Sequence, residues 1–308
     1  MPHDRHQIKA GLSYQGIKHK YLFESYDAGE MTYLTDDRSL PFLYTYGVGS
    51  SYVERQSDLI GAFVQDDWLL NEVVTLSLGV RYDVDIGGNN PDFEHPLLPG
   101  QRGTDWNNLQ PRLGFTWDLT RNGVNVLRGG AGLFTGRYTA TPSLAELQFN
   151  DVSGRYLQFR ISGLVLGLPP EYWLTVDDPQ NTGVPLPPTI YLLGESFRLP
   201  QSTQVTLGYT RRIGNSRLFF DIEGIYVDGR DEPVLHDSNW AGNENPGRID
   251  PTYTIVGQWV DEGYSEYKAL QLGLNGTIGG GHLISAWLSL SDKKNIQDDP
   301  QGSTDPSD

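Results

Sequence analysis

The chain has 308 residues, no cysteine, and 39 acidic against 23 basic residues, which gives a formal net charge of −16. This negative surplus argues against binding to a nucleic-acid backbone, and the lack of cysteine excludes disulfides, thiolate zinc sites, iron–sulfur clusters and a cysteine nucleophile. No run of 18 apolar residues exists, so we expect no transmembrane helix, and the first residues lack the apolar segment of a signal peptide. Two classes remain: a soluble all-β protein and an outer-membrane β-barrel.

Nine segments along the chain have the pattern of β-strands. The clearest is 73–83, where every second residue from Val74 to Tyr82 is apolar and the residues between them are polar or small. This alternation lasts about 10 residues, the length that a tilted membrane strand needs, whereas strands of soluble sandwiches average about five or six. The predicted strands are 6–23, 58–70, 73–86, 111–120, 124–136, 200–213, 216–229, 266–277 and 282–291.

Short and long connections alternate along these strands. The short ones hold hairpin signals such as Arg121-Asn-Gly123 and Gly279-Gly-Gly281. The long ones are 24–57, 87–109, 137–199 and 230–264. In an antiparallel up-and-down barrel this order places all short turns at one end and all long loops at the other, as in outer-membrane barrels. We therefore predict a partial barrel domain over 1–292 with four long outer loops, and a polar tail, or the start of a truncated outer loop, over 293–308.

Several segments carry motifs of a known family. They are Ala62-Phe-Val-Gln-Asp-Asp-Trp68, Thr75-Leu-Ser-Leu-Gly-Val-Arg-Tyr-Asp83, Gln110-Pro-Arg-Leu-Gly-Phe-Thr-Trp-Asp118, Val126-Leu-Arg-Gly-Gly-Ala-Gly-Leu-Phe134, Pro200-Gln-Ser-Thr-Gln204, Tyr267-Lys-Ala-Leu-Gln-Leu272 and Ser289-Leu-Ser-Asp292. In this order they resemble the barrel strands of TonB-dependent outer-membrane receptors. The later segments resemble the Oar-like branch, in which a carboxypeptidase-regulatory-like domain precedes the plug.

The resemblance implies an antiparallel transmembrane barrel of 22 strands in the outer membrane of a Gram-negative type cell, in contact with lipid. It also implies energised uptake, in which a substrate binds the outer loops and the TonB system pulls on the plug. Neither plug nor TonB box is recognisable here, the strand count is odd, and the polar end Gln301–Asp308 lacks the usual terminal aromatic residue. We therefore expect an incomplete fragment of the barrel, whose partners are the missing strands and, only through a plug absent from this chain, TonB.

The search for reactive groups predicts neither an enzyme nor a bound cofactor. The histidines lack the spacing of a zinc hydrolase, and no nucleophile elbow or phosphate-binding loop is present. Asp221 and Glu223 share a strand face, where lumen-facing carboxylates explain them more simply than a glycosidase pair. Asp228, Asp231 and Glu232 are candidate Ca²⁺ ligands, with solvated loop charge as the alternative.

The longest connection, 137–199, combines proline-rich stretches with aromatic residues. A loop of this length without secondary structure is usually functional or disordered. The candidate ligand-binding side chains are Tyr156, Phe159, Tyr172 and Trp173. They could stack on a ligand or pack the loop on itself, and the sequence leaves both readings open.

Three functions remain in order of preference. The first is the wall and outer-loop segment of a TonB-dependent receptor for an unidentified substrate. The second is an outer-membrane barrel with a structural, adhesion or secretion role, and the third is a soluble secreted all-β protein that binds carbohydrate. The long loops and the tail hold 27 acidic and 11 basic residues, which account for the whole net charge, so we expect the outer end to attract cationic ligands.

Overall fold

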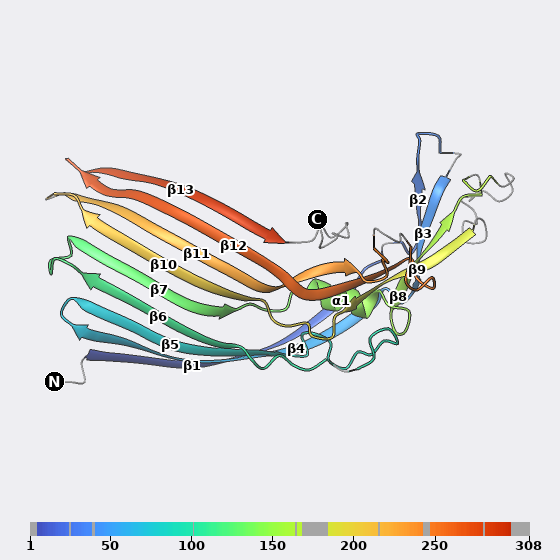
Figure 1. Ribbon diagram of the computed structural model, residues 1–308, viewed down its shortest axis with the longest axis horizontal. Coiled ribbons are helices and arrows are strands. Elements are labelled where there is room, and N and C mark those ends of the chain that lie inside the picture. Colours follow the sequence, from blue (N-terminus) through green and yellow to red (C-terminus); the bar gives the residue numbers. More distant parts are fainter. Residues whose placement is uncertain are drawn as a thin grey trace.

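The computed structural model describes residues 5–24, 26–38, 41–100, 102–163, 165–167, 184–214, 216–242, 247–279 and 281–296. Nine long strands form one strongly curved antiparallel wall with the shape of an open trough (Figure 1). In order along the chain they are β1 (His6–Leu22), β4 (Tyr52–Asn71), β5 (Val74–Ile86), β6 (Leu109–Asp118), β7 (Asn125–Thr135), β10 (Gln201–Arg212), β11 (Arg217–Asp237), β12 (Ile255–Ile278) and β13 (His282–Ile296).

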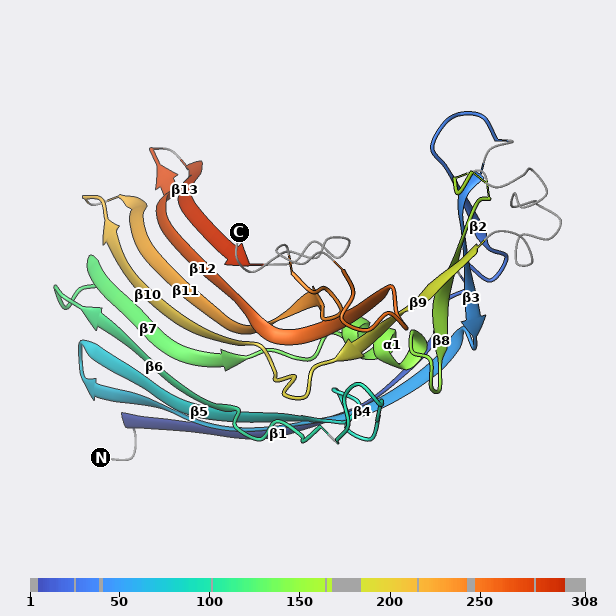
Figure 2. The ribbon, with the colours of Figure 1, turned by 45° about the vertical axis from the view of Figure 1, so that its right-hand side comes forward.

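These nine strands correspond to the nine predicted from alternation, and the all-β antiparallel fold class is confirmed. Each wall strand pairs with its successor in the wall, so the four short turns gather at one end of the trough and the long connections at the other (Figure 2). The barrel is not closed, because within the described residues the outer edges of β1 and β13 pair with no further strand. No described helix is long and apolar enough to cross a membrane.

The register puts apolar side chains of neighbouring strands side by side on the convex face. Val64 pairs with Val80, Leu78 with Leu113, and Leu272 with Leu288. Leu113 remains 56% exposed and Leu288 52% exposed. Apolar surface of this extent is unfavourable in water, at about 25 cal/mol per Å², so the face requires an apolar surrounding.

Glycines inside the strands face aromatic rings across the ladder. A Cβ atom at Gly11 would lie 2.4 Å from the ring of Phe63, and one at Gly273 would lie 2.3 Å from the ring of Trp287. Both rings therefore approach the backbone of the neighbouring strand closely. This close approach explains why glycine, which weakens a strand by itself, occurs in the middle of the wall.

The long connections contain more structure than the sequence predicts. A loop module, which we define as β2 (Glu30–Tyr33), β3 (Pro41–Gly49), α1 (Ala140–Gln148), β8 (Arg155–Ile161) and β9 (Val184–Leu193), lies at the long-loop end (Figure 2). Its strands continue the sheet from β12 in the order β9, β8, β3, β2. Segments of the first and third long connections therefore join into one sheet.

The predicted extents of three long connections need correction. Strands β2 and β3 and the start of β4 lie inside 24–57. The elements α1, β8 and β9 lie inside 137–199. The last residues of β11 and the first residues of β12 lie inside 230–264. The sequence does not predict β9 because this strand contains prolines, and proline cannot donate a hydrogen bond to a β-ladder. The parallel pairing of β9 with β12 begins only at Thr189, after the last of these prolines.

Candidate functional site on the concave face

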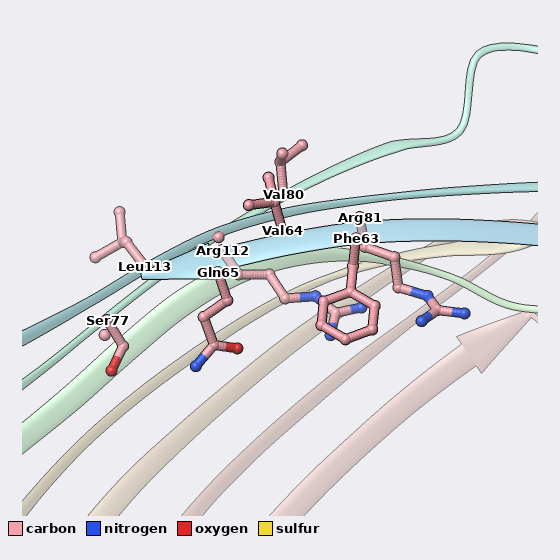
Figure 3. Close-up of a pocket in the computed structure, with 10 residues that line it drawn as sticks. Phe63, Val64, Gln65, Ser77, Val80, Arg81, Arg112 and Leu113 are labelled. Carbon is pink, nitrogen blue, oxygen red and sulfur yellow. The ribbon is translucent and has the colours of Figure 1, made fainter. Parts of the chain in front are cut away.

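Two sets of side chains leave the wall in opposite directions where β4, β5 and β6 lie side by side (Figure 3). Val64, Val80 and Leu113 belong to the apolar convex face. The set that points to the concave side comprises Phe63, Gln65, Ser77, Arg81 and Arg112. The site is therefore built by strand alternation, since residues two apart share a face.

A continuous chain of hydrogen bonds links four of the polar side chains on this face. The guanidinium of Arg81 donates from Nε and Nη2 to the two oxygens of Asp83, at 2.6 and 2.7 Å. Gln110 donates from Nε2 to Asp83 Oδ2 at 2.6 Å, and its own Oε1 accepts from Arg112 Nη2 at 2.9 Å. The guanidinium carbon of Arg112 also lies 4.4 Å from the ring centroid of Phe134, a cation–π distance.

Two further groups of charges on the concave face are paired directly, one around Asp67 and one around Arg128. Lys9 Nζ lies 2.8 Å from Asp67 Oδ2, and Ser77 Oγ donates to Asp67 Oδ1 at 2.7 Å. Arg128 lies 3.4 Å from Glu223 and 3.7 Å from Asp221. The sequence-based expectation that Asp221 and Glu223 face the lumen of a barrel agrees with their position on this face.

Beside Arg112, where several neighbouring positions are glycine, the wall has a hollow of about 360 Å³. Gly79 is the register partner of Arg112 on β5, and Gly132 is its partner on β7. One step nearer the short turns, Gly114 and Gly130 are paired on the same face. Because glycine adds no side chain, the floor of the hollow is backbone, and its walls are longer polar and aromatic groups.

At the long-loop end, a buried ion pair joins two connections. Arg102 Nη2 lies 2.5 Å from Glu146 Oε1, and Arg102 Nη1 lies 2.9 Å from Glu146 Oε2. Glu146 also accepts from the backbone N–H of Leu193 and the side-chain amide of Asn90. Burial raises the pKa of Glu146 above its ordinary value, although Arg102 opposes this shift.

A hydrogen-bonded group around the buried His95 connects the same region to the fourth long connection. Asp151 Oδ1 accepts from His95 Nε2 at 2.7 Å, and Asp151 Oδ2 accepts from the Tyr253 hydroxyl at 2.7 Å. His95 Nδ1 accepts from the backbone N–H of Leu97, which leaves the ring proton on the nitrogen that faces Asp151. Burial favours a raised pKa for Asp151, but these hydrogen bonds outweigh it, and the pKa lies below its ordinary value.

The predicted Ca²⁺ ligands have separate partners. Asp228 lies 2.9 Å from Arg230, Asp231 lies 2.8 Å from Arg198, and Glu232 accepts from Ser265 at 2.5 Å. Burial raises the pKa of Asp231, which disfavours its anionic form. In the described part of the chain no three His, Asp or Glu side chains gather to hold a metal ion. The Ca²⁺ site stays a prediction.

The predicted aromatic ligand-binding residues divide into two pairs. Tyr156 packs against a core cluster that includes Ile190 and Tyr253, and Phe159 is half-buried on β8. Their positions fit packing within the loop module. Tyr172 and Trp173 lie outside the described residues, so their role stays a prediction.

A comparison with models of protein families identifies the family that has this architecture. A model described as "Outer membrane beta barrel domain" matches residues 1–298. The chain belongs to the outer membrane beta barrel domain family. The predicted outer-membrane location is confirmed, the soluble carbohydrate-binding alternative is wrong, and the chain is part of a barrel wall rather than an enzyme.

Solved structures support the same fold for this outer membrane beta barrel domain. The outer membrane transporter YddB from Escherichia coli matches with a TM-score of 0.55 at 15% identity, over 94% of this chain and 31% of that chain. The FrpB iron transporter (F5-1 variant) from Neisseria meningitidis matches with a TM-score of 0.54 at 12% identity, over 98% and 36%. No curated protein matches.

The chain thus spans about one third of the length of either transporter. At these identities the likeness shows the fold alone. It agrees with the resemblance to the barrel of TonB-dependent receptors and with a partial barrel. The Oar-like branch receives no support from these matches and stays a prediction.

No sequence motif singles out the residues that line the hollow of this outer membrane beta barrel domain. Arg81 and Arg112 occur at polar positions of alternating strands, which was the available signal for a lumen-facing location. Their connection through Asp83 and Gln110 depends on the register of β5 with β6, in which Arg81 faces Gln110. Spacing along the sequence does not specify that register.

Proposed function

We propose that the chain is the wall and outer-loop segment of a TonB-dependent outer-membrane receptor that takes up a substrate. The observation that supports this most is the two-faced wall of nine antiparallel strands, apolar on the convex face and charged on the concave face. A barrel that encloses an aqueous lumen within lipid needs this division.

The ordered long-loop end supports a receptor more than a simple pore. Buried ion pairs such as Arg102–Glu146 fix the loop module in one arrangement, and a preorganised surface binds ligands at a lower entropic cost. Exposed acidic residues of the loops, among them Asp36, Asp92 and Glu262, outnumber the exposed basic ones in the described regions. We propose that the substrate carries positive charge where it meets the loops.

The rest of the barrel is the partner that the open edges require. β1 and β13 both run from the short-turn end toward the long-loop end, because each wall strand is antiparallel to its neighbour. An antiparallel closure between these two edges therefore needs an odd number of additional strands. We propose that these strands, together with a plug that contacts TonB, belong to the complete receptor.

The coding sequence around this reading frame provides the first test. We expect it to encode a plug with a TonB box upstream and an odd number of further barrel strands. The second test is uptake by cells that produce the complete protein, measured with labelled cationic solutes with and without TonB. A complete reading frame without a plug, or uptake that is unchanged without TonB, would contradict the proposal and favour a structural, adhesion or secretion role.

A further inference from the structure

A polar depression lies at the long-loop end of the wall, between the segment that precedes β6 and the segment that precedes β10. Its volume is about 420 Å³, and it is lined by residues 103–107 and 195–198. The Tyr82 hydroxyl, on the convex face of β5, donates to the backbone carbonyl of Trp106 at 2.9 Å. β6 and β10 belong to the middle of the wall, so the depression lies beside the convex face and away from both open edges.

Hydrogen bonds hold the two segments against each other. Asp105 Oδ2 accepts from the backbone N–H of Leu199 at 3.0 Å, which joins one segment to the other. The Tyr138 hydroxyl donates to the backbone carbonyl of Phe197 at 2.9 Å, and the ring of Phe197 belongs to a buried cluster. The depression is therefore preorganised, which lowers the entropic cost of binding a ligand.

The lining of the depression combines one large aromatic surface with free polar groups. Trp106 is 60% exposed. Four polar side chains beside it make no hydrogen bond or ion pair with any other described residue, namely those of Thr104, Asn107, Glu195 and Ser196. An aromatic face among convergent polar groups is typical of a small-molecule site, whereas a tryptophan of an interfacial girdle needs no such neighbours.

The depression carries excess negative charge. The only cation among its lining residues is Arg198, which lies 2.6 Å from Asp261 and 2.8 Å from Asp231, so its charge is already matched. The carboxylates of Asp105 and Glu195 form no ion pair with a described cation. The surrounding charge therefore favours a cationic ligand and disfavours an anionic one.

We propose that this depression is a binding site for a soluble saccharide that carries a protonated amino group, such as a glucosamine unit. The apolar face of the sugar ring covers the exposed indole of Trp106, and sugar hydroxyl groups pair with Asn107 and Ser196. The ammonium group lies between the carboxylate of Glu195 and the indole, since both attract a cation. The site lies outside the lumen, so the proposal requires neither TonB nor transport of the ligand.

The test uses the complete barrel that contains this chain, in lipid nanodiscs, with calorimetry as the measurement. The probes are the dimer of glucosamine, in mildly acidic buffer in which its amino groups are protonated, and its uncharged N-acetylated form. The charged dimer should bind about tenfold more tightly, because only this probe gains the charge-assisted contact with Glu195. Equal affinity for the two probes, or binding of neither, would overturn the proposal.

Two variants separate the role of the indole from that of the carboxylate. Trp106→Ala should weaken binding of the charged dimer by about tenfold, the loss of one aromatic anchor. Glu195→Gln should lower the affinity for the charged dimer to that for the acetylated dimer, and leave the affinity for the acetylated dimer unchanged. An unchanged affinity in Trp106→Ala, or an unchanged preference for the charged dimer in Glu195→Gln, would overturn the proposal.

The matched controls are Trp117→Ala and Glu94→Gln. The first removes an indole that is 45% exposed at the short-turn end. The second removes an exposed carboxylate from the long connection before β6, outside the depression. Both should keep the affinity for the charged dimer within about twofold. The same loss in a control as in its partner variant would overturn the proposal.

A measurement on the unaltered barrel excludes misfolding of a variant as the cause. The charged dimer should slow hydrogen exchange in residues 103–107 and leave it unchanged in the short turn 119–124. Equal exchange rates in residues 103–107 with and without the dimer would overturn the proposal independently.

Discussion

The guanidinium of Arg102 and the carboxylate of Glu146 form a buried, two-fold hydrogen-bonded pair that joins the loop before β6 to helix α1. Their side chains are 4% and 0% exposed, and the oxygen–nitrogen distances are 2.5 and 2.9 Å. Arg102 also donates to the carbonyl oxygens of Leu193 and Gly194, next to β9. This pair of residues thus holds together the loop at Arg102 and the end of β9, which lie about 90 positions apart in the sequence.

Removal of one partner should loosen the loop module without unfolding the wall. We expect Glu146→Ala to destabilise the module by about 3–5 kcal/mol, because it leaves the Arg102 guanidinium buried and unpaired. Hydrogen exchange followed by mass spectrometry should show faster exchange in α1 and β9 and unchanged exchange in β5 and β6.

The exposed pair Arg230–Asp228 provides the control for that experiment. Arg230 is 74% exposed, so Arg230→Ala should change stability by less than about 1 kcal/mol. If Glu146→Ala and Arg230→Ala had equal effects on exchange in α1, the buried pair would not be what holds the module.

Acid should release the contact that Asp151 makes with His95 and Tyr253. The pKa of Asp151 is below its ordinary value of 3.8 in the folded protein, so its ionised form stabilises the fold. This contribution is fully present above pH 3.8 and decreases as the pH falls through the lower, folded-state pKa. Hydrogen exchange around His95 should therefore accelerate in that acidic window.

Asp151→Asn tests whether this carboxylate is responsible. The variant should exchange faster around His95 at neutral pH, and its exchange should no longer show the additional acid-dependent acceleration. An identical acid response in the unaltered chain and in Asp151→Asn would attribute the release to another group.

Gly276 should tolerate no side chain. Its φ is +140°, and a Cβ atom there would lie 1.9 Å from the carbonyl oxygen of Arg217 on the paired strand. Gly276→Ala should cost about 1–3 kcal/mol, since the backbone must shift where β12 pairs with β11. Urea unfolding of the complete barrel that contains this chain, in detergent micelles, measures the change. Gly103→Ala, at a site with no atom within 4 Å, should stay within about 0.5 kcal/mol.

The two faces of β6 should respond differently to a positive charge. Leu113→Arg places a guanidinium on the convex face and should destabilise the membrane-inserted state by about 2–4 kcal/mol if the residue lies near the bilayer centre. Thr116→Arg, on the concave face of the same strand, should cost much less because an aqueous lumen hydrates the charge. Folding of the complete barrel that contains this chain into lipid vesicles, measured in urea, compares the two variants. Equal costs would contradict the assignment of the faces.

The wall could be predicted from the sequence because its signal is local. Alternation with a period of two residues follows from the geometry of a single strand, so segments such as 73–83 showed both the strand and its two faces. The position of acidic charge in the long connections was equally visible, since it required only the limits of the strands. The family motifs added the outer-membrane location.

The loop module and the candidate site depended on tertiary structure. β9 contains prolines and pairs with β12, which begins more than 60 residues later, so no local pattern could reveal that ladder. Arg102 meets Glu146, and Arg112 approaches Asp83 through Gln110, only because particular strands are neighbours in one register. The sequence by itself determined which residues face lipid or lumen, because side-chain direction is a property of one strand. Only the tertiary structure decided which charges of the described residues are paired, because pairing depends on distances between strands.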